Sequence, residues 1–364
     1  DRLARESLQT FAAETGGFAV VNTNRLANAF DRIVDENSSY YVLAYYPPNP
    51  KRDGKYHNIN VRVTRPGLTV RFRKGYANQT GKAPAPPPKG TVSPELLEAI
   101  SSPIPVSGVG MKVFSAPFKG TAPNASILVG VELRGRDLTT TANGRVDVGY
   151  SIVDSRGKLK ASNSDTVTLN LRPETKARIE KDGMRLLTRL DVPAGHYQLR
   201  VAAHDAGGGT VGSVFYDLDV PDFAKERLAM SGLVLTSPTA ANVVTAKPDN
   251  ELRMLLPGPP AGAREFSHTE QLALFTDVYD NDVTPAHKVD ITTTLTADAG
   301  RVVYKNEEER STEDLGGKPG GFGIGTTLSL SDFEPGLYVL KIEARSRLGN
   351  DVKASREVQI RITQ

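Results

Sequence analysis

The chain has 364 residues, no cysteine and a formal net charge of +3 at neutral pH. This length exceeds one ordinary core and predicts two or three domains, and the 38% hydrophobic and 24% charged residues are typical of globular proteins. The lack of cysteine excludes disulfides, thiolate catalysis and cysteine-ligated zinc, and no apolar run approaches the roughly 18 residues that a membrane-spanning helix needs.

Residues 1–80 predict a partial α/β segment of Rossmann-like type. The stretch "RLARESLQTFAAETGG" places Ala4, Leu8, Phe11 and Ala12 on one helical stripe, and the closing glycines end the helix. The apolar run that follows, residues 17–21, predicts a short buried strand.

A second helix and a second strand are expected next. Residues 24–38 carry an apolar face of helical period, and residues 38–46 ("SSYYVLAYY") form an aromatic-rich strand that two prolines end. A strand, a helix and a strand in this order predict a parallel pair joined by a right-handed crossover.

A basic hairpin is predicted at residues 57–76. Two alternating runs, 59–63 and 68–72, are separated by an Arg-Pro-Gly turn. The outer face could bind phosphate or acidic glycans, or it could protect the sheet edge from pairing. We favour edge protection and expect no nucleic-acid partner, because no aromatic residues alternate with the charges. The basic residues of this face are Arg62, Arg71, Arg73 and Lys74.

Residues 81–104 are interpreted as a linker with a short helix, and the rest of the chain as all-β. Residues 81–90 ("GKAPAPPPKG") predict a semi-rigid proline-rich linker, and residues 93–101 a helix. Alternating strands separated by turn clusters then predict two tandem β-sandwiches of immunoglobulin or fibronectin type, at residues 105–224 and 225–364.

A phrase that occurs twice supports the tandem arrangement. The stretch "LDVPAGHYQLRV" at residues 190–201 returns as "LSDFEPGLYVLKI" at residues 330–342, one domain length further along. In such sandwiches a tyrosine near the start of a late strand donates its hydroxyl to the backbone a few residues upstream. Tyr197 and Tyr338 are predicted to form this tyrosine corner, one in each sandwich.

The sequence predicts no catalytic residue, no cofactor-binding residue and no metal ligand. Serine-hydrolase, zinc-protease, nucleotide-binding-loop and kinase motifs are all missing. The histidines lack the spacing of metal ligands and are interpreted as structural. They are His57, His196, His204, His268 and His287.

Two further stretches are candidate sites. Asp277, Asp280 and Asp282 could hold calcium, but the turning glycine and the distal glutamate of a calcium loop are missing, which favours a hydrogen-bonded turn. Residues 305–325 join an acidic run to the glycine-rich "GGKPGGFGIG" and predict a long loop, the expected contact or mobile region of the last domain.

Residues 10–76 carry a resemblance to a known family. The Thr-Gly-Gly, the run "AFDRIVDENSSYYVLAYYPP" and the ending "RPGLTVRFRKGY" resemble the C-terminal end of a bacterial von Willebrand factor A-related domain of the Acidobacteria type, found in predicted secreted proteins. The resemblance implies a secreted, extracellular or periplasmic location. The metal-binding D-x-S-x-S loop of this family is missing, and "DENSS" at residues 35–39 has the wrong spacing.

The predicted function is therefore a non-enzymatic binding or adhesion module that mediates protein–protein interaction. The missing N-terminal half of the A domain would come from a separate chain or a partner protein, or was not captured in this sequence. One alternative is a structural subunit of an extracellular fibre or surface assembly, self-assembling through an open sheet edge in residues 1–80. A carbohydrate-binding accessory module is a second alternative, disfavoured because the chain has no tryptophan.

Overall fold

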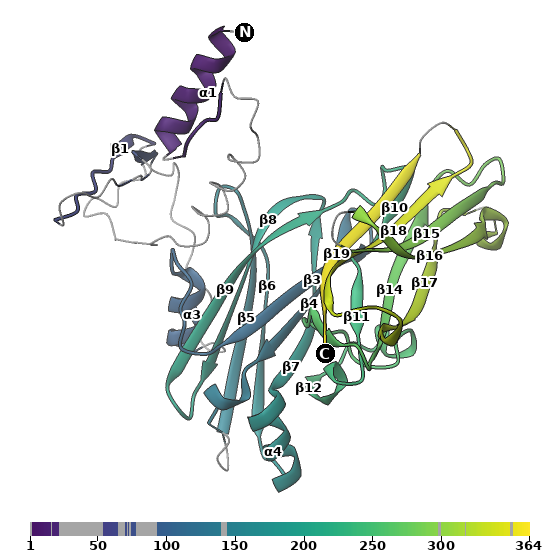
Figure 1. Ribbon diagram of the computed structural model, residues 1–364. Helices are drawn as coiled ribbons and strands as arrows, with labels where there is room; N and C mark the ends of the chain where they lie inside the picture. The colour runs from purple at the N-terminus through teal and green to yellow at the C-terminus, as the bar shows by residue number, and fades with distance from the viewer. Residues whose placement is uncertain are drawn as a thin grey trace. The chain divides into compact units, whose positions relative to one another are not determined.

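The computed structural model describes residues 2–15, 17–21, 54–64, 70, 72, 74–77, 93–139, 144–297, 300–316, 318–349 and 352–364. The chain divides into two compact units, Asp1–Pro88 and Lys89–Gln364 (Figure 1). In the described part of the chain no helix is long and apolar enough to cross a membrane.

The described residues of the first unit form one helix and one short hairpin. Helix α1 (Arg2–Thr15) forms as predicted and ends before the glycine pair. On its predicted apolar stripe, Leu8 is 57% and Phe11 is 71% exposed. Strand β1 (Tyr56–Asn58) pairs antiparallel with β2 (Gly75–Ala77), so two short strands pair at the ends of the expected hairpin. Residues 59–63, predicted as its first strand, are not in a strand, so that part of the prediction is wrong.

The predicted Rossmann-like segment is not shown. Residues 17–21 are not in a strand and are only partly covered, so the prediction of a buried strand there is wrong. An apolar run becomes a buried strand only where a neighbour pairs with it, and no described strand pairs with this one. The predicted second helix at 24–38, the strand at 38–46 and the linker at 81–90 lie outside the described residues.

The second unit begins with a β-sandwich of two four-stranded sheets, ordered β12-β7-β4-β3 and β6-β5-β8-β9. Alternating apolar residues of both inner faces fill its core, including Ile127, Val129, Val148 and Ile152. The strands are β3 (Met111–Lys119), β4 (Asn124–Leu133), β5 (Gly144–Asp154), β6 (Leu159–Leu169), β7 (Met184–Pro193), β8 (Gly195–Asp205), β9 (Thr210–Val220) and β12 (Val244–Lys247).

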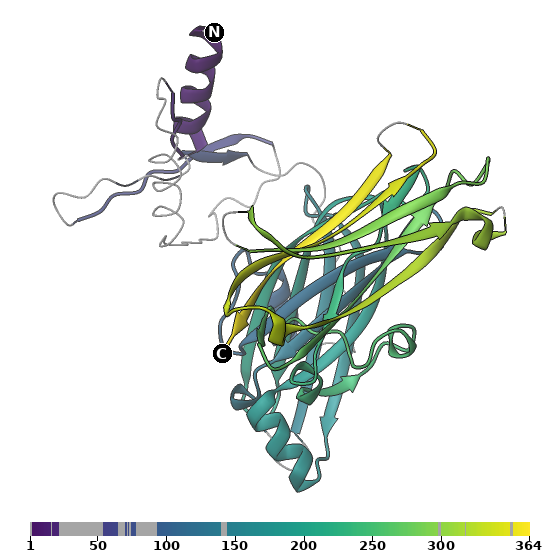
Figure 2. The same ribbon diagram turned by 45° about the vertical axis from the view of Figure 1, so that its right-hand side comes forward.

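Two helices accompany this sandwich. The expected helix α3 (Pro94–Ser101) packs Leu96 and Ala99 against Ala202 of β8, so it belongs to the sandwich and not to the linker. Helix α4 (Pro173–Asp182), which connects β6 to β7, corrects the prediction that this region is all-β (Figure 2). Its signals are a proline at the first turn and Gly183 just past the end, at a φ of 89°.

The second sandwich has sheets ordered β10-β14-β11, with β17 also on β14, and β13-β19-β18-β15-β16. The strands are β10 (Leu228–Met230), β11 (Val234–Thr236), β13 (Glu265–Ser267), β14 (Gln271–Asp280), β15 (Lys288–Ala297), β16 (Val302–Ser311), β17 (Gly320–Ser329), β18 (Gly336–Ser346) and β19 (Lys353–Thr363). Its core contains Ile291, Leu295, Leu340 and Ile342.

The two sandwiches repeat one strand order, which confirms the β-sandwich prediction at this level. The sheet β6-β5-β8-β9 corresponds to β16-β15-β18-β19. The Tyr197 hydroxyl donates to the Pro193 carbonyl at 3.0 Å, and the Tyr338 hydroxyl donates to the Glu334 carbonyl at 2.6 Å. The predicted tyrosine corners are therefore both present at the same place in the repeat.

The prediction of a long loop at residues 305–325 is wrong. Most of this stretch belongs to β16 and β17, and a short 3-10 helix (Thr312–Leu315) lies between them. The glycines of β17 allow aromatic rings of β14 to pack closely against this strand. A Cβ on Gly321 would lie 2.7 Å from the Tyr279 ring, and a Cβ on Gly323 would lie 3.1 Å from the Phe275 ring. Glycine in a strand marks such a close approach.

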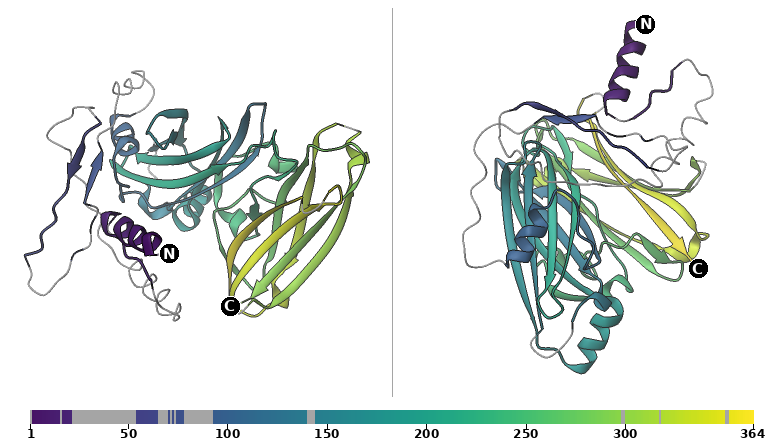
Figure 3. Two further views of the ribbon diagram at one scale, coloured as in Figure 1. Left: turned by 90° about the horizontal axis from the view of Figure 1, so that it is seen from above. Right: turned by 90° about the vertical axis from the view of Figure 1, so that its left-hand side faces the viewer.

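The two sandwiches share a third apolar cluster. Phe114, Phe118 and Leu128 of the first sandwich pack with Ala273 and Phe275 of the second. Figure 3 shows the two sandwiches side by side. Strand β12, which follows the boundary predicted at residue 224, pairs in parallel with β7 of the first sandwich. The sandwiches therefore form one body with a common interface.

Candidate functional site

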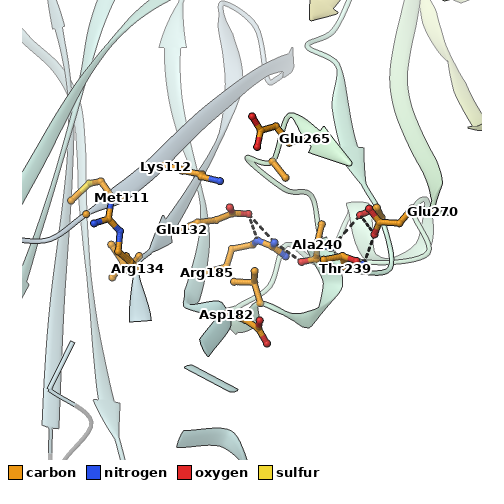
Figure 4. A pocket seen from close by; sticks show the side chains of 15 residues that line it. Met111, Lys112, Glu132, Arg134, Asp182, Arg185, Thr239, Ala240, Glu265 and Glu270 are labelled. Carbon is orange, nitrogen blue, oxygen red and sulfur yellow. Dashed lines mark hydrogen bonds and ion pairs between the residues drawn. The ribbon is translucent and has the colours of Figure 1, made fainter. Parts of the chain in front are cut away.

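A cavity of about 410 Å³ lies where the two sandwiches meet (Figure 4). The first sandwich contributes the start of β3, the end of β4, the end of α4 and the start of β7. Two segments complete the wall: 237–243, which connects β11 of the second sandwich to β12 of the first, and 263–270, which contains β13 of the second sandwich. Because both sandwiches build this pocket, its shape depends on their mutual contact.

A buried ion pair forms the floor of the junction. Arg185 of strand β7 is 0% exposed although it is charged. Its Nε donates to Glu132 Oε1 at 2.9 Å, and its Nη2 lies 2.8 Å from the same oxygen and donates to the Ala240 carbonyl at 2.7 Å. Glu132 also accepts from the Gly262 NH at 3.0 Å. This pair thus ties strands of the first sandwich to two segments of the second.

Glu270 fixes the opposite wall. Its carboxylate accepts hydrogen bonds from the Thr239 NH at 2.9 Å, the Ser267 NH at 3.0 Å and the Ser237 hydroxyl at 3.1 Å. Burial alone would raise the pKa of Glu270, but these hydrogen bonds outweigh it and lower the pKa below its usual value. The side chain is therefore a carboxylate that holds the segment 237–240 in place.

The rim of the pocket carries both signs of charge. Lys112 and Arg134 are exposed on the side of the first sandwich, and Glu265 is exposed on the side of the second. Asp182, at the end of α4, also lines the pocket and lies below Arg185 in Figure 4. The Nη1 of Arg185 is buried and makes no hydrogen bond to the described residues. Such a pocket offers donors and acceptors to a polar ligand.

A serine–histidine hydrogen bond occurs elsewhere in the first sandwich. Ser93 Oγ lies 3.0 Å from His204 Nδ1 and also accepts from the Leu96 NH at 3.3 Å. Because Ser93 is the N-cap of α3, its hydroxyl links the first turn of this helix to His204 of β8. The pair holds α3 on the sheet, which agrees with the structural interpretation of this histidine.

His287 forms a buried pair in the second sandwich. Its Nε2 lies 2.9 Å from Asp280 Oδ2, and its Nδ1 lies 3.0 Å from the Pro285 carbonyl oxygen. The ring is therefore held between two oxygen atoms, one of a carboxylate and one of a backbone carbonyl. The structural interpretation of His287 is consistent with this position between β14 and β15.

The aspartates weighed for calcium have protein partners. The Asp282 NH donates to Asp280 Oδ1 at 2.9 Å, which is the hydrogen-bonded turn that was favoured. Arg227 donates to Asp282 Oδ2 through Nε at 2.9 Å and Nη2 at 2.6 Å, and Asp277 accepts from the Tyr279 hydroxyl at 3.1 Å. Among the described residues no group of three acidic, histidine or cysteine side chains could hold a metal ion.

A second cluster of charges lies at the interface of the sandwiches. Arg189 donates to Asp249 through Nε at 2.6 Å and Nη2 at 3.2 Å, and its guanidinium lies 5.2 Å from the Phe118 ring centre. Burial would raise the pKa of Asp249, but the bonds from Arg189 outweigh it and lower the pKa. Burial raises the pKa of Asp277, against the lowering effect of its bond from Tyr279.

Sequence reasoning missed the residues of the junction pocket. Glu132 alternates with the core-facing Val131 and Leu133, and Arg185 alternates with the core-facing Met184 and Leu186. The pattern therefore places both charges on the outer face of the first sandwich, where charged residues are ordinary. They are buried because the second sandwich packs on that face, and no local pattern in the sequence shows this contact.

Comparisons with known proteins give no family. No family model matches the chain, and no curated protein matches it. Among solved structures, the chain is similar over 64% of its length to a Bacteroides uniformis beta-glucuronidase, at 10% identity and a TM-score of 0.26. It is similar over 71% of its length to a red sea bream transglutaminase, at 10% identity and a TM-score of 0.21.

A putative beta-galactosidase from Bacteroides fragilis is similar over 65% of the chain, at 9% identity and a TM-score of 0.23. The chain spans only 26% of the glucuronidase and 32% of each of the other two proteins. Likenesses this weak carry no inference about activity.

Proposed function

We propose that this chain is a non-enzymatic binding module that engages a protein partner through the pocket between its two sandwiches. The observation that carries the proposal is the junction itself. A shared apolar cluster and the Arg185–Glu132 pair hold the sandwiches together, and a polar cavity opens between them. Concave sites with a few convergent polar groups at domain junctions are typical ligand sites.

The chemistry of the pocket favours a peptide segment as ligand. Lys112 and Arg134 on one side of the rim and Glu265 on the other complement a segment that carries both signs of charge. The resemblance of residues 10–76 to the end of a secreted von Willebrand factor A-related domain supports a location outside the cytoplasm, at the cell surface or in the periplasm.

Capture from an envelope extract tests the proposal with matched charge reversals. The full chain serves as bait. The test variant Lys112→Glu/Arg134→Glu reverses the two positive charges of the pocket rim. The control variant Arg156→Glu/Lys158→Glu reverses two exposed positive charges of the β5–β6 turn. We expect wild type and control to retain the same protein, and the rim variant to retain about tenfold less, since two interfacial charge contacts reverse. Equal retention by all three, or by none, would contradict the pocket as the binding site.

A structural subunit of a surface assembly is the second candidate. One observation favours it: β17 presents ten residues without charge or proline at a sheet edge. Light scattering of the purified chain separates the two candidates, because a fibre subunit grows into large species with concentration, whereas a binding module stays a small defined species.

A further inference from the structure

One edge strand of the second sandwich has none of the features that keep sheet edges apart. Strand β17 ("GGFGIGTTLS") pairs with β14 along its whole length and with no other described strand. Native proteins protect exposed edges with charge, proline, bulges or a covering segment. A regular uncharged strand of ten residues is therefore unusual as a free edge.

The other long edge strands of the described part are protected. Each carries charges or a proline at intervals along its length, which disfavours pairing with another chain. These residues are Lys112 and Pro117 in β3, Lys160 and Asp165 in β6, Asp217 and Asp219 in β9, and the charged run 307–310 in β16.

The first sandwich shows that the equivalent edge accepts a strand. Strand β7 occupies there the place of β17, next to β4 as β17 is next to β14. Its free side is paired in parallel by β12 from Val244 to Lys247. The side of this strand that faces away from its neighbour is therefore covered by β12 in the first sandwich and open in the second sandwich.

We propose that β17 pairs edge to edge with β17 of a second copy of this chain, antiparallel and around a twofold axis at Gly325. Antiparallel pairing of identical strands is self-complementary. With Gly325 opposite itself, Phe322 lies opposite Leu328 of the second copy, and both side chains stay on the core side of the joined sheet. The outer face carries only glycine, threonine and serine across the joint.

Charge complementarity at the two ends of the strand favours this pairing. Lys318 and Asp332 flank the strand and are exposed, and neither forms an ion pair with another described residue. Lys318 lies two residues before β17, and Asp332 ends the short 3-10 helix (Leu330–Asp332) that follows it. The proposed pairing therefore brings Lys318 of one copy to the same end of the joint as Asp332 of the other, at both ends. One pair of opposite charges therefore lies at each end of the joint, with the two apolar and glycine-rich strands between them. No like charges meet across the joint.

Sedimentation velocity of the full chain from about 1 to about 100 µM, the range of moderate affinities, tests the pairing. We expect a monomer–dimer equilibrium for the wild type. Each of the variants Lys318→Glu and Asp332→Lys brings like charges together at both ends of the joint. Either variant should therefore raise the dissociation constant about tenfold. Mixed together, these two variants should associate again as a heterodimer, because both pairs then regain opposite signs.

The controls separate the interface from the fold and from the pocket. Lys158→Glu, in the β5–β6 turn, changes the same charge elsewhere and should leave the dissociation constant unchanged. Thr327→Lys, on the exposed face of β17, should give a monomer with an unchanged melting temperature. A chain that stays monomeric over the whole range, or a dimer that ignores Lys318, Asp332 and Thr327, would overturn the proposal. Neither result bears on partner capture by the rim of the junction pocket.

Discussion

At the residue scale, Arg185 is the side chain on which the junction depends most. Its guanidinium is buried and bonded to Glu132 and to the Ala240 carbonyl. Removal of one partner of a buried pair leaves the other uncompensated, so Arg185→Met should lower the free energy of unfolding by about 3 kcal/mol. Urea denaturation measures this. The double variant Arg185→Met/Glu132→Leu should recover part of the loss, and an equal or larger loss would contradict the pairing.

Asp249 and Asp277 give opposite pH dependences at the interface. The pKa of Asp249 is lowered in the folded state, so its contribution is present above the usual carboxyl pKa and is lost as the pH falls through the folded value. We expect Asp249→Asn to melt lower than wild type at pH 7, and the difference to shrink on acidification. Thermal melts between pH 3 and pH 7 measure it.

The pKa of Asp277 is raised, so the folded state binds a proton more tightly and stability falls as the pH rises through that window. Asn at position 277 still accepts from the Tyr279 hydroxyl but does not titrate. The free energy of unfolding of Asp277→Asn, compared with that of wild type, should therefore increase as the pH rises from acid to pH 7. The same melts measure this change. A constant difference across the pH range would show that Asp277 titrates normally.

At the element scale, the tyrosine corners are equivalent in position but differ in burial. The Tyr338 side chain is buried, whereas the bond from Tyr197 is exposed. Tyr338→Phe should therefore cost about 1 kcal/mol of unfolding free energy, and Tyr197→Phe clearly less, since water replaces an exposed partner. Chemical denaturation compares the two variants, and a larger loss at Tyr197 would contradict the assignment.

The glycines of β17 allow a second matched comparison. A Cβ on Gly321 would lie 2.7 Å from Tyr279 Cδ1, whereas one on Gly325 would have its nearest neighbour at 4.0 Å. Gly321→Ala should lower stability by about 1–3 kcal/mol through overpacking. Gly325→Ala serves as the control and should change it little. Equal melting temperatures for the two variants would show that the ring of Tyr279 moves aside freely.

Elements were predictable from the sequence where a pattern was local. Helices α1 and α3 follow from helical stripes and caps, and the repeated Gly-x-Tyr phrase located β8 and β18. The prediction of a loop at the glycine-rich β17 is wrong because its glycines make room for aromatic rings of β14. The sequence of β17 alone does not show these rings. The pairing of Arg185 with Glu132 joins residues distant in the chain, and local periodicity carries no information about such a contact.

At the scale of the whole molecule, the second unit behaves as one body because its sandwiches share apolar surface. Phe275 and Ala273 lie on the side of their sheet that faces the first sandwich, and both are buried there. Sequence patterns predicted two modules joined in series, with a boundary at residue 224. The strand β12 and the shared cluster instead cross that boundary.

The distance between the two sandwiches tests this claim most directly. The chain has no cysteine, so Arg156→Cys and Glu307→Cys place one spin label on each sandwich. Double electron–electron resonance should give one narrow distance distribution, which Phe275→Asp should broaden by placing a charge in the shared cluster. A broad distribution in the labelled chain without that substitution would contradict a rigid pair of sandwiches.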